Sequence, residues 1–299
     1  MPDQYTMQDP TTLYADRKPD EQYLPGAGTD KELAENMPAD HGEDTYRGSG
    51  RLQDRKALVT GGDSGIGAAV AIAFAREGAD VAIVYLPEEE TDAKRIVGFI
   101  EDAGRKAVAI PGDLKDAAFA REAVQKAVDG LGGLDIVVNN AGKQQNVDSI
   151  VDITDEEFDE TFKTNVYGTF WVTKAAVPHL APGSTIINTT SIQAYAPSPN
   201  LIQYAATKAT VNNLAKGLAA QLAPKGIRVN AVAPGPIWTP LQPAGGQKPE
   251  DLPTAGDETY LGRWGQPAEL APAFVFLASG ESSFVVGETL HVDGGMPTP

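Results

Sequence analysis

From residue 51 onward, short runs of β-branched and other apolar residues alternate with longer stretches in which apolar residues recur at helical spacing. The runs predict seven strands, over Lys56–Thr60, Asp80–Tyr85, Ala107–Ile110, Asp135–Asn139, Thr185–Thr189, Arg228–Val232 and Thr289–Val292. The longer stretches predict helices, over Gly65–Glu77, Glu89–Ala103, Asp116–Val128, Asp155–Val177, Leu201–Leu222 and Pro267–Ala278. Strands that alternate with helices predict an α/β fold, with a Rossmann-type doubly wound sheet of about seven parallel strands in a single domain.

Residues 1–50 lack this alternation and form an acidic, polar N-terminal extension. They hold 11 of the 41 acidic residues, 4 of the 24 basic ones and five prolines, a composition typical of a solvated tail. Four of the nine tyrosines also lie here, namely Tyr5, Tyr14, Tyr23 and Tyr46. Aromatic residues spaced along a polar segment can dock it on a folded surface, so an ordered arm is the alternative to a free tail.

The net charge of -17 disfavours nucleic acids and anionic membranes as partners. The chain has no cysteine, which excludes disulfides, thiolate metal sites and a cysteine nucleophile. Its three histidines, His41, His179 and His291, lack metal-ligand spacing, so we expect no metal. We see neither a basic leader followed by an apolar run nor a stretch of roughly 18 apolar residues, and we expect a cytoplasmic protein.

A glycine-rich run, Thr60–Gly67, directly follows the first predicted strand and opens the next helix. A dinucleotide pyrophosphate needs backbone amides at a helix N-terminus and close approach without Cβ atoms, and glycines at this turn supply both. The same run could also be no more than a tight connection from strand to helix. Its spacing, with glycines at 61, 65 and 67, resembles the cofactor turn of the short-chain dehydrogenase/reductase family.

Other motifs of that family follow in order: Asn139-Asn140-Ala141-Gly142, Asn165, Ser191, Tyr204 with Lys208, Pro234-Gly235 and Asp293-Gly294-Gly295. The residues around these motifs are similar to those of the branch named after glucose and ribitol dehydrogenases. The resemblance covers about residues 51–299 and implies a catalytic dinucleotide-binding domain, NAD or NADP as cofactor, and a homotetramer. It implies that the catalytic residues are Ser191, Tyr204, Lys208 and Asn165. It implies that the cofactor-binding residues are Gly61, Asp63, Ser64, Gly65, Ile66, Gly67, Tyr85, Asp113, Leu114, Asn139, Ala141, Gly142, Tyr204, Lys208, Pro234, Gly235, Ile237 and Thr239.

The spacing of Tyr204 and Lys208 suits hydride transfer from an alcohol, because four residues place both side chains on one helix face. Oxidising an alcohol requires a group that takes the hydroxyl proton. A phenol can do so where an ammonium stabilises its ionised form, so we expect Tyr204 as general acid/base and Lys208 as that ammonium. We expect Ser191 to hydrogen-bond the reacting oxygen, and the resemblance implies that Asn165 holds a water linking Lys208 to solvent. A second pair at this spacing, Tyr14 and Lys18, is expected to be a chance match.

The choice of cofactor depends on the residues after the second predicted strand. There Tyr85-Leu86-Pro87 offers neither an acid for a ribose 2′-hydroxyl nor a base for a 2′-phosphate. Asp63 and the run Glu88–Glu90 would leave a 2′-phosphate beside uncompensated negative charge. We therefore expect NAD, with NADP as the alternative.

The long connection 241–263 is rich in proline and glycine and predicts either a lid over the site or a passive loop. Several polar or amphipathic residues follow strand ends and could line a substrate pocket, namely Gln144, Gln145, Gln193, Tyr195 and Trp238. Lys143 could favour an anionic substrate or simply be exposed. The leading hypothesis is an oxidoreductase that interconverts an alcohol (a secondary alcohol, sugar or polyol) and its carbonyl. The competing hypothesis is a non-catalytic dinucleotide-binding sensor or scaffold that uses residues 1–50 for interaction.

Overall fold

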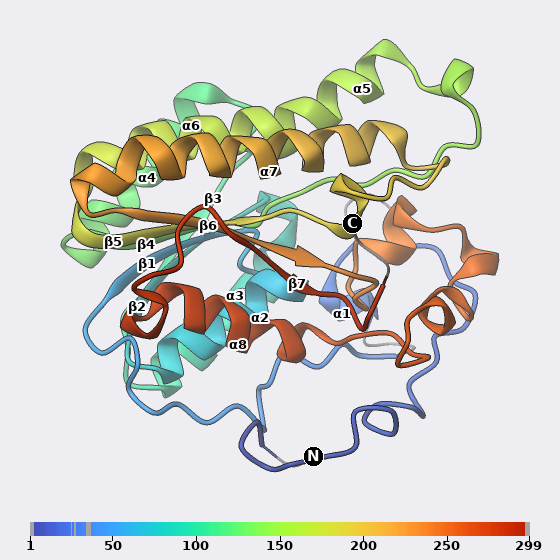
Figure 1. The fold of residues 1–299 in the computed structure, drawn as a ribbon, viewed down its shortest axis with the longest axis horizontal. Coiled ribbons are helices and arrows are strands. Elements are labelled where there is room, and N and C mark those ends of the chain that lie inside the picture. The colour runs from blue at the N-terminus through green and yellow to red at the C-terminus, as the bar shows by residue number, and fades with distance from the viewer. Residues whose placement is uncertain (1–2, 25, 27, 34–36, 297–299) are drawn as a thin grey trace.

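A computed structural model of the chain describes residues 3–24, 26, 28–33 and 37–296. Its sheet has seven parallel strands in the order β3-β2-β1-β4-β5-β6-β7 (Figure 1). The strands are β1 (Lys56–Thr60), β2 (Asp80–Tyr85), β3 (Ala107–Pro111), β4 (Leu134–Asn139), β5 (Leu180–Thr189), β6 (Arg228–Pro234) and β7 (Thr289–Val292). The strand order reverses between β1 and β4, and ligands bind at such a switch point. The predicted doubly wound sheet is confirmed.

Helices cover both faces of the sheet (Figure 1). One face carries α4 (Ala117–Leu131), α5 (Asp155–Phe162), α6 (Thr169–Ala176) and α7 (Ile202–Leu222), and the other carries α2 (Gly65–Arg76), α3 (Glu90–Asp102) and α8 (Pro267–Ala278). The helix predicted over Asp155–Val177 is continuous in space, but its middle, Lys163–Gly168, is wound as a π-helix between α5 and α6.

Two apolar cores lie on opposite faces of the sheet. In β1, Val59 belongs to the core shared with α2, α3 and α8, whereas Leu58 belongs to the core shared with α4, α6 and α7. Successive side chains of a strand point to opposite faces, so a strand covered on both sides must be apolar throughout. This requirement explains why the central strands are continuous apolar runs in the sequence.

The described part of residues 3–50, which we call the arm, runs along the body and is ordered against it (Figure 1). Its short helix α1 (Asp30–Leu33) lies close to α3. Tyr14 and Tyr46 are buried, and their hydroxyls donate hydrogen bonds of 2.7 Å to Asp40 and Glu77. Tyr5 and Tyr23 are exposed. The arm is therefore docked, by two of the four tyrosines named above, and the free-tail interpretation is wrong for these residues.

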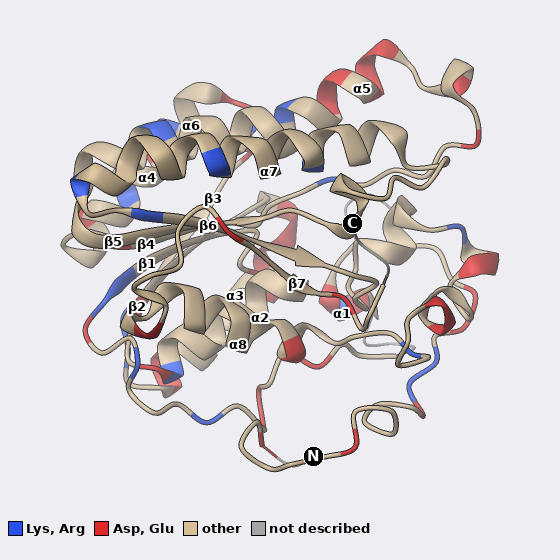
Figure 2. Ribbon diagram, viewed as in Figure 1, with Lys and Arg blue, Asp and Glu red and all other residues tan. Residues whose placement is uncertain are grey.

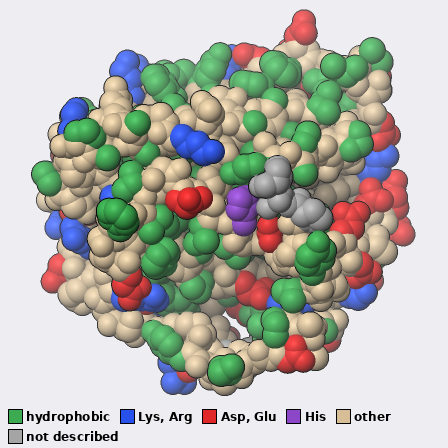
Figure 3. All heavy atoms as spheres, viewed as in Figure 1, with side chains coloured by type: hydrophobic (Ala, Val, Ile, Leu, Met, Phe, Trp, Pro, Cys, Tyr) green, Lys and Arg blue, Asp and Glu red, His purple; other side chains and the backbone are tan. Residues whose placement is uncertain are grey.

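Charge is unevenly spread over the molecule. Aspartates and glutamates gather at the end that holds α5 and the loops after β6, whereas many lysines and arginines lie toward the opposite end of the sheet (Figures 2 and 3). Within the described residues, no helix is both long enough and apolar enough to cross a bilayer.

Candidate active site

A cavity of about 890 Å³ opens at the carboxyl ends of the strands. The turn from β1 to α2, the end of β2 and the segments after β3 and β4 form one half of its wall. The segments after β5 and β6, with Tyr204 and Lys208 of α7, form the other half. Residues from 241–258 also line it, so the connection predicted to be a lid or a passive loop borders the cavity as a series of short turns.

The glycine turn can hold a diphosphate. A Cβ on Gly67 would lie 1.7 Å from the Gly61 carbonyl oxygen, so only glycine lets α2 begin so close to β1. Gly65 has a positive φ of 48°, and its amide donates a 3.2 Å hydrogen bond to Asp30 of the arm. The amides of Ile66 and Gly67 have no partner among the described residues, and such free amides at a helix N-terminus bind anions.

Acidic side chains surround the end of β2. Asp63 is buried in the cavity wall, and neither of its carboxylate oxygens has a hydrogen-bond partner in the described structure. Burial and the nearby Glu89 carboxylate raise the pKa of Asp63 well above its usual range. Burial also raises the pKa of Glu89, to about 7. Tyr85 lines the cavity here too, and its hydroxyl donates to Glu90.

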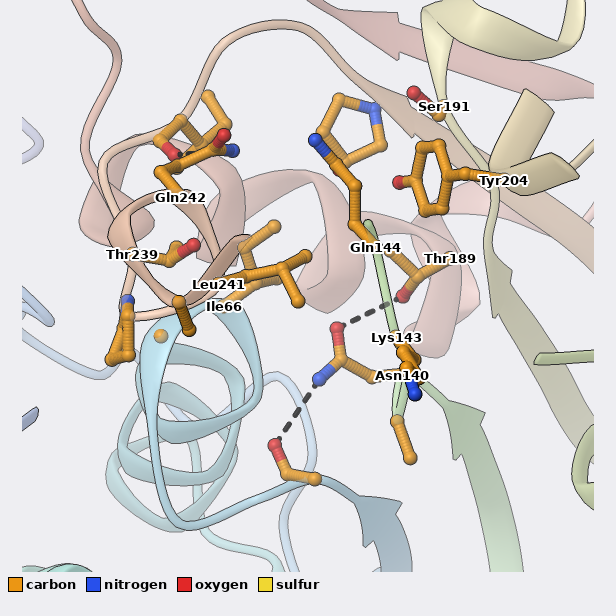
Figure 4. A pocket seen from close by; sticks show the side chains of 18 of the residues that line it. Ile66, Asn140, Lys143, Gln144, Thr189, Ser191, Tyr204, Thr239, Leu241 and Gln242 are labelled. Carbon is orange, nitrogen blue, oxygen red and sulfur yellow. Dashed lines mark hydrogen bonds between the residues drawn. The ribbon is translucent and has the colours of Figure 1, made fainter. Parts of the chain in front are cut away.

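The two asparagines at the end of β4, Asn139 in the strand and Asn140 directly after it, differ from the expectation. Asn139 is turned away from the cavity, and its Nδ2 donates to Thr173 and Asn188 in the core behind it. Asn140 faces the cavity instead: its Nδ2 donates to the Gly61 carbonyl and its Oδ1 accepts from Thr189 Oγ1 (Figure 4). Asn140 therefore ties the glycine turn to the end of β5. The strand alternation could have singled it out, because neighbouring residues point to opposite sides.

Ser191, Tyr204 and Lys208 meet in the cavity wall. Tyr204 and Lys208 are buried on one face of α7, with Lys208 Nζ 5.5 Å from the centre of the Tyr204 ring. Lys208 Nζ donates to the Thr189 carbonyl oxygen at 2.9 Å. Figure 4 shows Tyr204 beside Ser191, with Gln144 on the side of its hydroxyl and the residues of 239–242 across the cavity.

Burial sets the protonation of this pair. Burial raises the pKa of the Tyr204 phenol to about 12. A hydrogen bond with Ser191 lowers this pKa, but the effect of burial is larger. Burial lowers the pKa of the Lys208 ammonium to about 8. At neutral pH Tyr204 thus carries its proton and Lys208 its charge, so the phenol is able to donate a proton beside a fixed cation.

Asn165 lies behind this group, in the π-helical segment. Its Oδ1 accepts from the Lys143 amide at 2.7 Å, and its Nδ2 donates to the Lys143 carbonyl and to Thr207 Oγ1, each at 2.9 Å. These bonds tie the segment after β4, which contains Lys143, to α7. Asn165 is not among the cavity-lining residues, but a Cβ on Gly142 would lie 3.5 Å from its Oδ1 and 3.6 Å from Lys208 Nζ. The predicted water link to Lys208 remains a prediction.

The other expected cofactor residues fall into two groups. Those that line the cavity are Gly61, Ser64, Gly65, Ile66, Asp113, Leu114, Ala141, Gly142, Pro234, Gly235, Ile237 and Thr239. Gly67 and Asn139 do not line it, because Gly67 is pressed against Gly61 and Asn139 faces the core. Lys143 lines the cavity with its charge paired to Glu160 at 2.5 Å, which disfavours its use for an anionic substrate.

Several amide side chains line the part of the cavity beside residues 241–258. Gln144, Gln145 and Gln193 line the cavity as expected. Tyr195 and Trp238 do not line it: the Tyr195 hydroxyl accepts from Asn212, and the buried Trp238 indole donates to the Met37 carbonyl. Sequence reasoning missed several polar lining residues, among them Ser198, Asn200, Gln242 and Gln247, because they lie in loops without periodicity.

Comparison with known proteins agrees with this geometry. A family model described as enoyl-(acyl carrier protein) reductase matches residues 61–297. The uncharacterized oxidoreductase YghA of Escherichia coli is 56% identical, over 97% of this chain and 98% of its own length. A solved short-chain dehydrogenase from Burkholderia cenocepacia, in complex with NADP, is 38% identical, with a TM-score of 0.77 over 82% of this chain and 98% of that one. The chain belongs to the short-chain dehydrogenase/reductase family.

Within that family, the glucose and ribitol dehydrogenase homolog of Oryza sativa is 43% identical, over 84% of this chain and 89% of its own length. The branch suggested by the sequence is thereby confirmed. The chain is an oxidoreductase that acts on CH–OH groups with a nicotinamide dinucleotide. The free amides of the glycine turn and the cavity beside Tyr204 fit such a cofactor.

Proposed function

We propose that this enzyme interconverts a hydroxyl group of an uncharged, hydroxyl-rich small molecule and the corresponding carbonyl, with NAD as the preferred cofactor. The observation that carries the proposal is the convergence of Tyr204, Ser191 and the Lys208 ammonium on one cavity wall, facing a glycine turn with free amides. These groups supply proton transfer, orientation of the reacting oxygen and phosphate binding in one connected space.

The chain's own residues handle the proton. Ser191 Oγ accepts from the Gln193 amide at 3.1 Å, which leaves its hydroxyl hydrogen available to Tyr204 or to the oxygen of the substrate. Tyr204 gives its proton to that oxygen in reduction and takes it back in oxidation. Lys208 lowers the cost of the ionised phenol by its charge. A bound nicotinamide dinucleotide supplies the hydride donor or acceptor.

The preference for NAD rests on the charges at the end of β2. Glu88, Glu89 and Asp63 line the cavity there, whereas the cationic lining residues Lys115 and Lys143 follow β3 and β4 and Lys208 lies on α7. A 2′-phosphate would add negative charge beside Asp63 and Glu89, whose pKa values are already raised by burial and by repulsion from neighbouring carboxylates, whereas a ribose 2′-hydroxyl can donate to the unpartnered oxygens of Asp63. The Burkholderia relative was solved with NADP, so NADP is the cofactor against which NAD must be compared.

The amide-lined wall supports an uncharged, hydroxylated substrate. Carboxamides donate and accept hydrogen bonds without carrying charge, which matches hydroxyl groups. Gln242 Oε1 is buried without a partner among the described residues, although its Nε2 donates to the Ile237 carbonyl. A substrate hydroxyl at this position would satisfy Gln242.

The test is absorbance of reduced nicotinamide during incubation with a panel of polyols and sugars in one direction and hydroxylated aldehydes in the other. We expect turnover with hydroxylated substrates, and tighter binding of NADH than of NADPH by fluorescence titration. Turnover confined to carboxylated substrates would contradict the substrate class, and tighter NADPH binding would contradict the cofactor choice. Dinucleotide binding without any turnover would favour the sensor or scaffold alternative, against which the intact Ser191, Tyr204 and Lys208 argue.

We further propose that the enzyme is a homotetramer. Among the exposed aromatic side chains, Phe158, Tyr167 and Phe170 lie along α5, the π-helical segment and α6, and Phe284 lies between α8 and the edge strand β7. Tetramers with three two-fold axes need at least two self-complementary patches. Sedimentation equilibrium of the wild type and of Phe284→Glu tests this: we expect a tetramer that Phe284→Glu splits into dimers, and a monomeric wild type would contradict it.

A further inference from the structure

The arm is an addition to a sheet that is complete without it. The Burkholderia structure aligns over 98% of its own length but covers only 82% of this chain. Residues 51–299 make up about the same share of the chain. The Escherichia coli relative, by contrast, matches 97% of this chain, so its similarity extends into the arm. The fold therefore does not explain why the arm is docked so closely, and its contacts point to the active site.

One contact joins the arm to the glycine turn. Asp30, the first residue of α1, is buried, and its Oδ2 accepts the hydrogen bond from the Gly65 amide at the N-terminus of α2. Gly65 lines the cavity. Since Asp30 occupies this one amide, the free amides that remain in the first turn of α2 are those of Ile66 and Gly67. A side chain from the arm thus fixes the orientation of the turn proposed to hold the cofactor.

Asp30 is itself held in place by a network that spans arm and body. His41 Nε2 of the arm lies 2.9 Å from its Oδ2, and Arg95 of α3 lies 3.1 Å from the same oxygen. The Asp30 amide donates to Asp92 of α3 at 2.7 Å. Glu43 of the arm pairs with both His41 and Arg95. The carboxylate of Asp30 therefore has little freedom to leave Gly65.

A second contact joins the arm to the lid. Leu24, Leu33 and Ala39 of the arm form a small buried cluster with Trp238, Leu252 and Trp264, separate from the two main cores. The Trp238 indole donates to the Met37 carbonyl at 2.9 Å, and the Leu24 amide donates to the Pro243 carbonyl at 2.9 Å. Trp238 stands between Ile237 and Thr239, which line the cavity. The apolar underside of the lid is thus covered by the arm.

We propose that the arm is a working part of the cofactor site, with Asp30 as a positioning residue that sets the glycine turn and Leu33 as a residue that holds the lid. This inference rests on the proposed function, which assigns the glycine turn to dinucleotide binding. It predicts that damage to these two contacts weakens cofactor binding or loosens the lid, while the proton-transfer group keeps its rate.

The test uses the full chain and titrates NADH and NADPH by fluorescence. Asp30→Ala should weaken binding of the preferred cofactor by about tenfold, because it removes a charge-assisted hydrogen bond to the turn. Asp30→Asn keeps an acceptor oxygen for Gly65 but loses the ion pairs with His41 and Arg95, so its affinity should lie between those of wild type and Asp30→Ala. Both variants should keep kcat at saturating cofactor. Leu33→Ala should leave kcat unchanged and speed cleavage of the lid by a protease severalfold, because it opens a cavity under the lid.

Lys18→Met is the matched control, since Lys18 also joins arm to lid, by a solvent-exposed pair with Asp257, and should change neither readout. The proposal would be overturned if Asp30→Ala bound the cofactor as tightly as wild type, or if Asp30→Asn bound it as weakly as Asp30→Ala. It would also be overturned if Leu33→Ala left the rate of lid cleavage unchanged. Absence of dinucleotide binding in the wild type would instead overturn the proposed function. The two failures are therefore distinguishable.

Discussion

Replacing Lys208 with methionine should make the protein more stable and far less active. Burial lowers the pKa of the Lys208 ammonium from its ordinary 10.5 to about 8. At about 1.4 kcal/mol per pKa unit, keeping this charge in the folded state costs about 3 kcal/mol at neutral pH. Methionine retains the apolar stem and removes the charge. The substitution also leaves the Thr189 carbonyl without its 2.9 Å hydrogen bond, which costs about 1–2 kcal/mol. The expected net gain in unfolding free energy is roughly 1–2 kcal/mol at pH 7.

The stability difference between Lys208→Met and wild type should depend on pH. Between pH 8 and pH 10.5 the unfolded chain holds a proton on Lys208 that the folded chain has lost, so wild-type stability rises with pH through this window. The advantage of Lys208→Met should therefore be full below pH 8 and shrink above it. Urea denaturation at pH 7 and pH 10 measures both values.

Lys216→Met is the matched control, because Lys216 is exposed on the same helix and should change stability by less than about 0.5 kcal/mol. Turnover of Lys208→Met should fall at least about 100-fold, since Tyr204 loses the neighbouring cation. A Lys208→Met protein that is less stable than wild type at pH 7, or whose advantage does not change with pH, would show that burial does not destabilise the Lys208 charge.

Three further predictions concern single contacts. Ser191→Ala should lower kcat by about 100-fold and leave NADH affinity unchanged, in steady-state kinetics and fluorescence titration, and a change in affinity alone would contradict its role. Gly67→Ala should abolish dinucleotide binding or folding, seen by titration and circular dichroism, because its Cβ would lie 1.7 Å from the Gly61 carbonyl oxygen; a variant that binds normally would contradict the packing argument. Burial opposes the charge on His41, but Asp30 and Glu43 raise its pKa to about 10, so its contribution to stability is complete below pH 6.5 and is lost toward pH 10. The loss should be about 1.4 kcal/mol per pH unit in urea denaturation and absent in His41→Asn, and equal slopes in both proteins would contradict it.

Most of the sheet could be predicted from the sequence because its physical signal is local. A strand buried on both faces must be apolar throughout, as Leu58 and Val59 show, and each run ends where the cavity begins. The start of β5 was missed, since Leu180–Ser184 contains Pro182 and Gly183 and shows no apolar run. The π-helical segment around Asn165 could not be predicted, because α-helical and π-helical windings share nearly the same apolar spacing.

The arm was the least predictable part, since single long-range contacts rather than any repeat hold it in place. Tyr14 meets Asp40, and Trp238 meets Met37 from two hundred residues away, and neither contact leaves a periodic signal in the sequence. The composition correctly indicates a polar segment, but polarity does not distinguish a docked arm from a free tail. The ion pairs of His41 with Asp30 and Glu43 likewise could not be predicted, because they depend on how the arm folds against α3.

The central claim is that Tyr204 transfers the proton during hydride transfer. It is tested most directly by measuring kcat for wild type and Tyr204→Phe with the best substrate of the panel, after NADH titration has shown equal affinity in both proteins. We expect kcat to fall about a thousandfold, the usual contribution of general acid–base catalysis. A Tyr204→Phe enzyme that binds NADH normally and turns over within tenfold of wild type would contradict it.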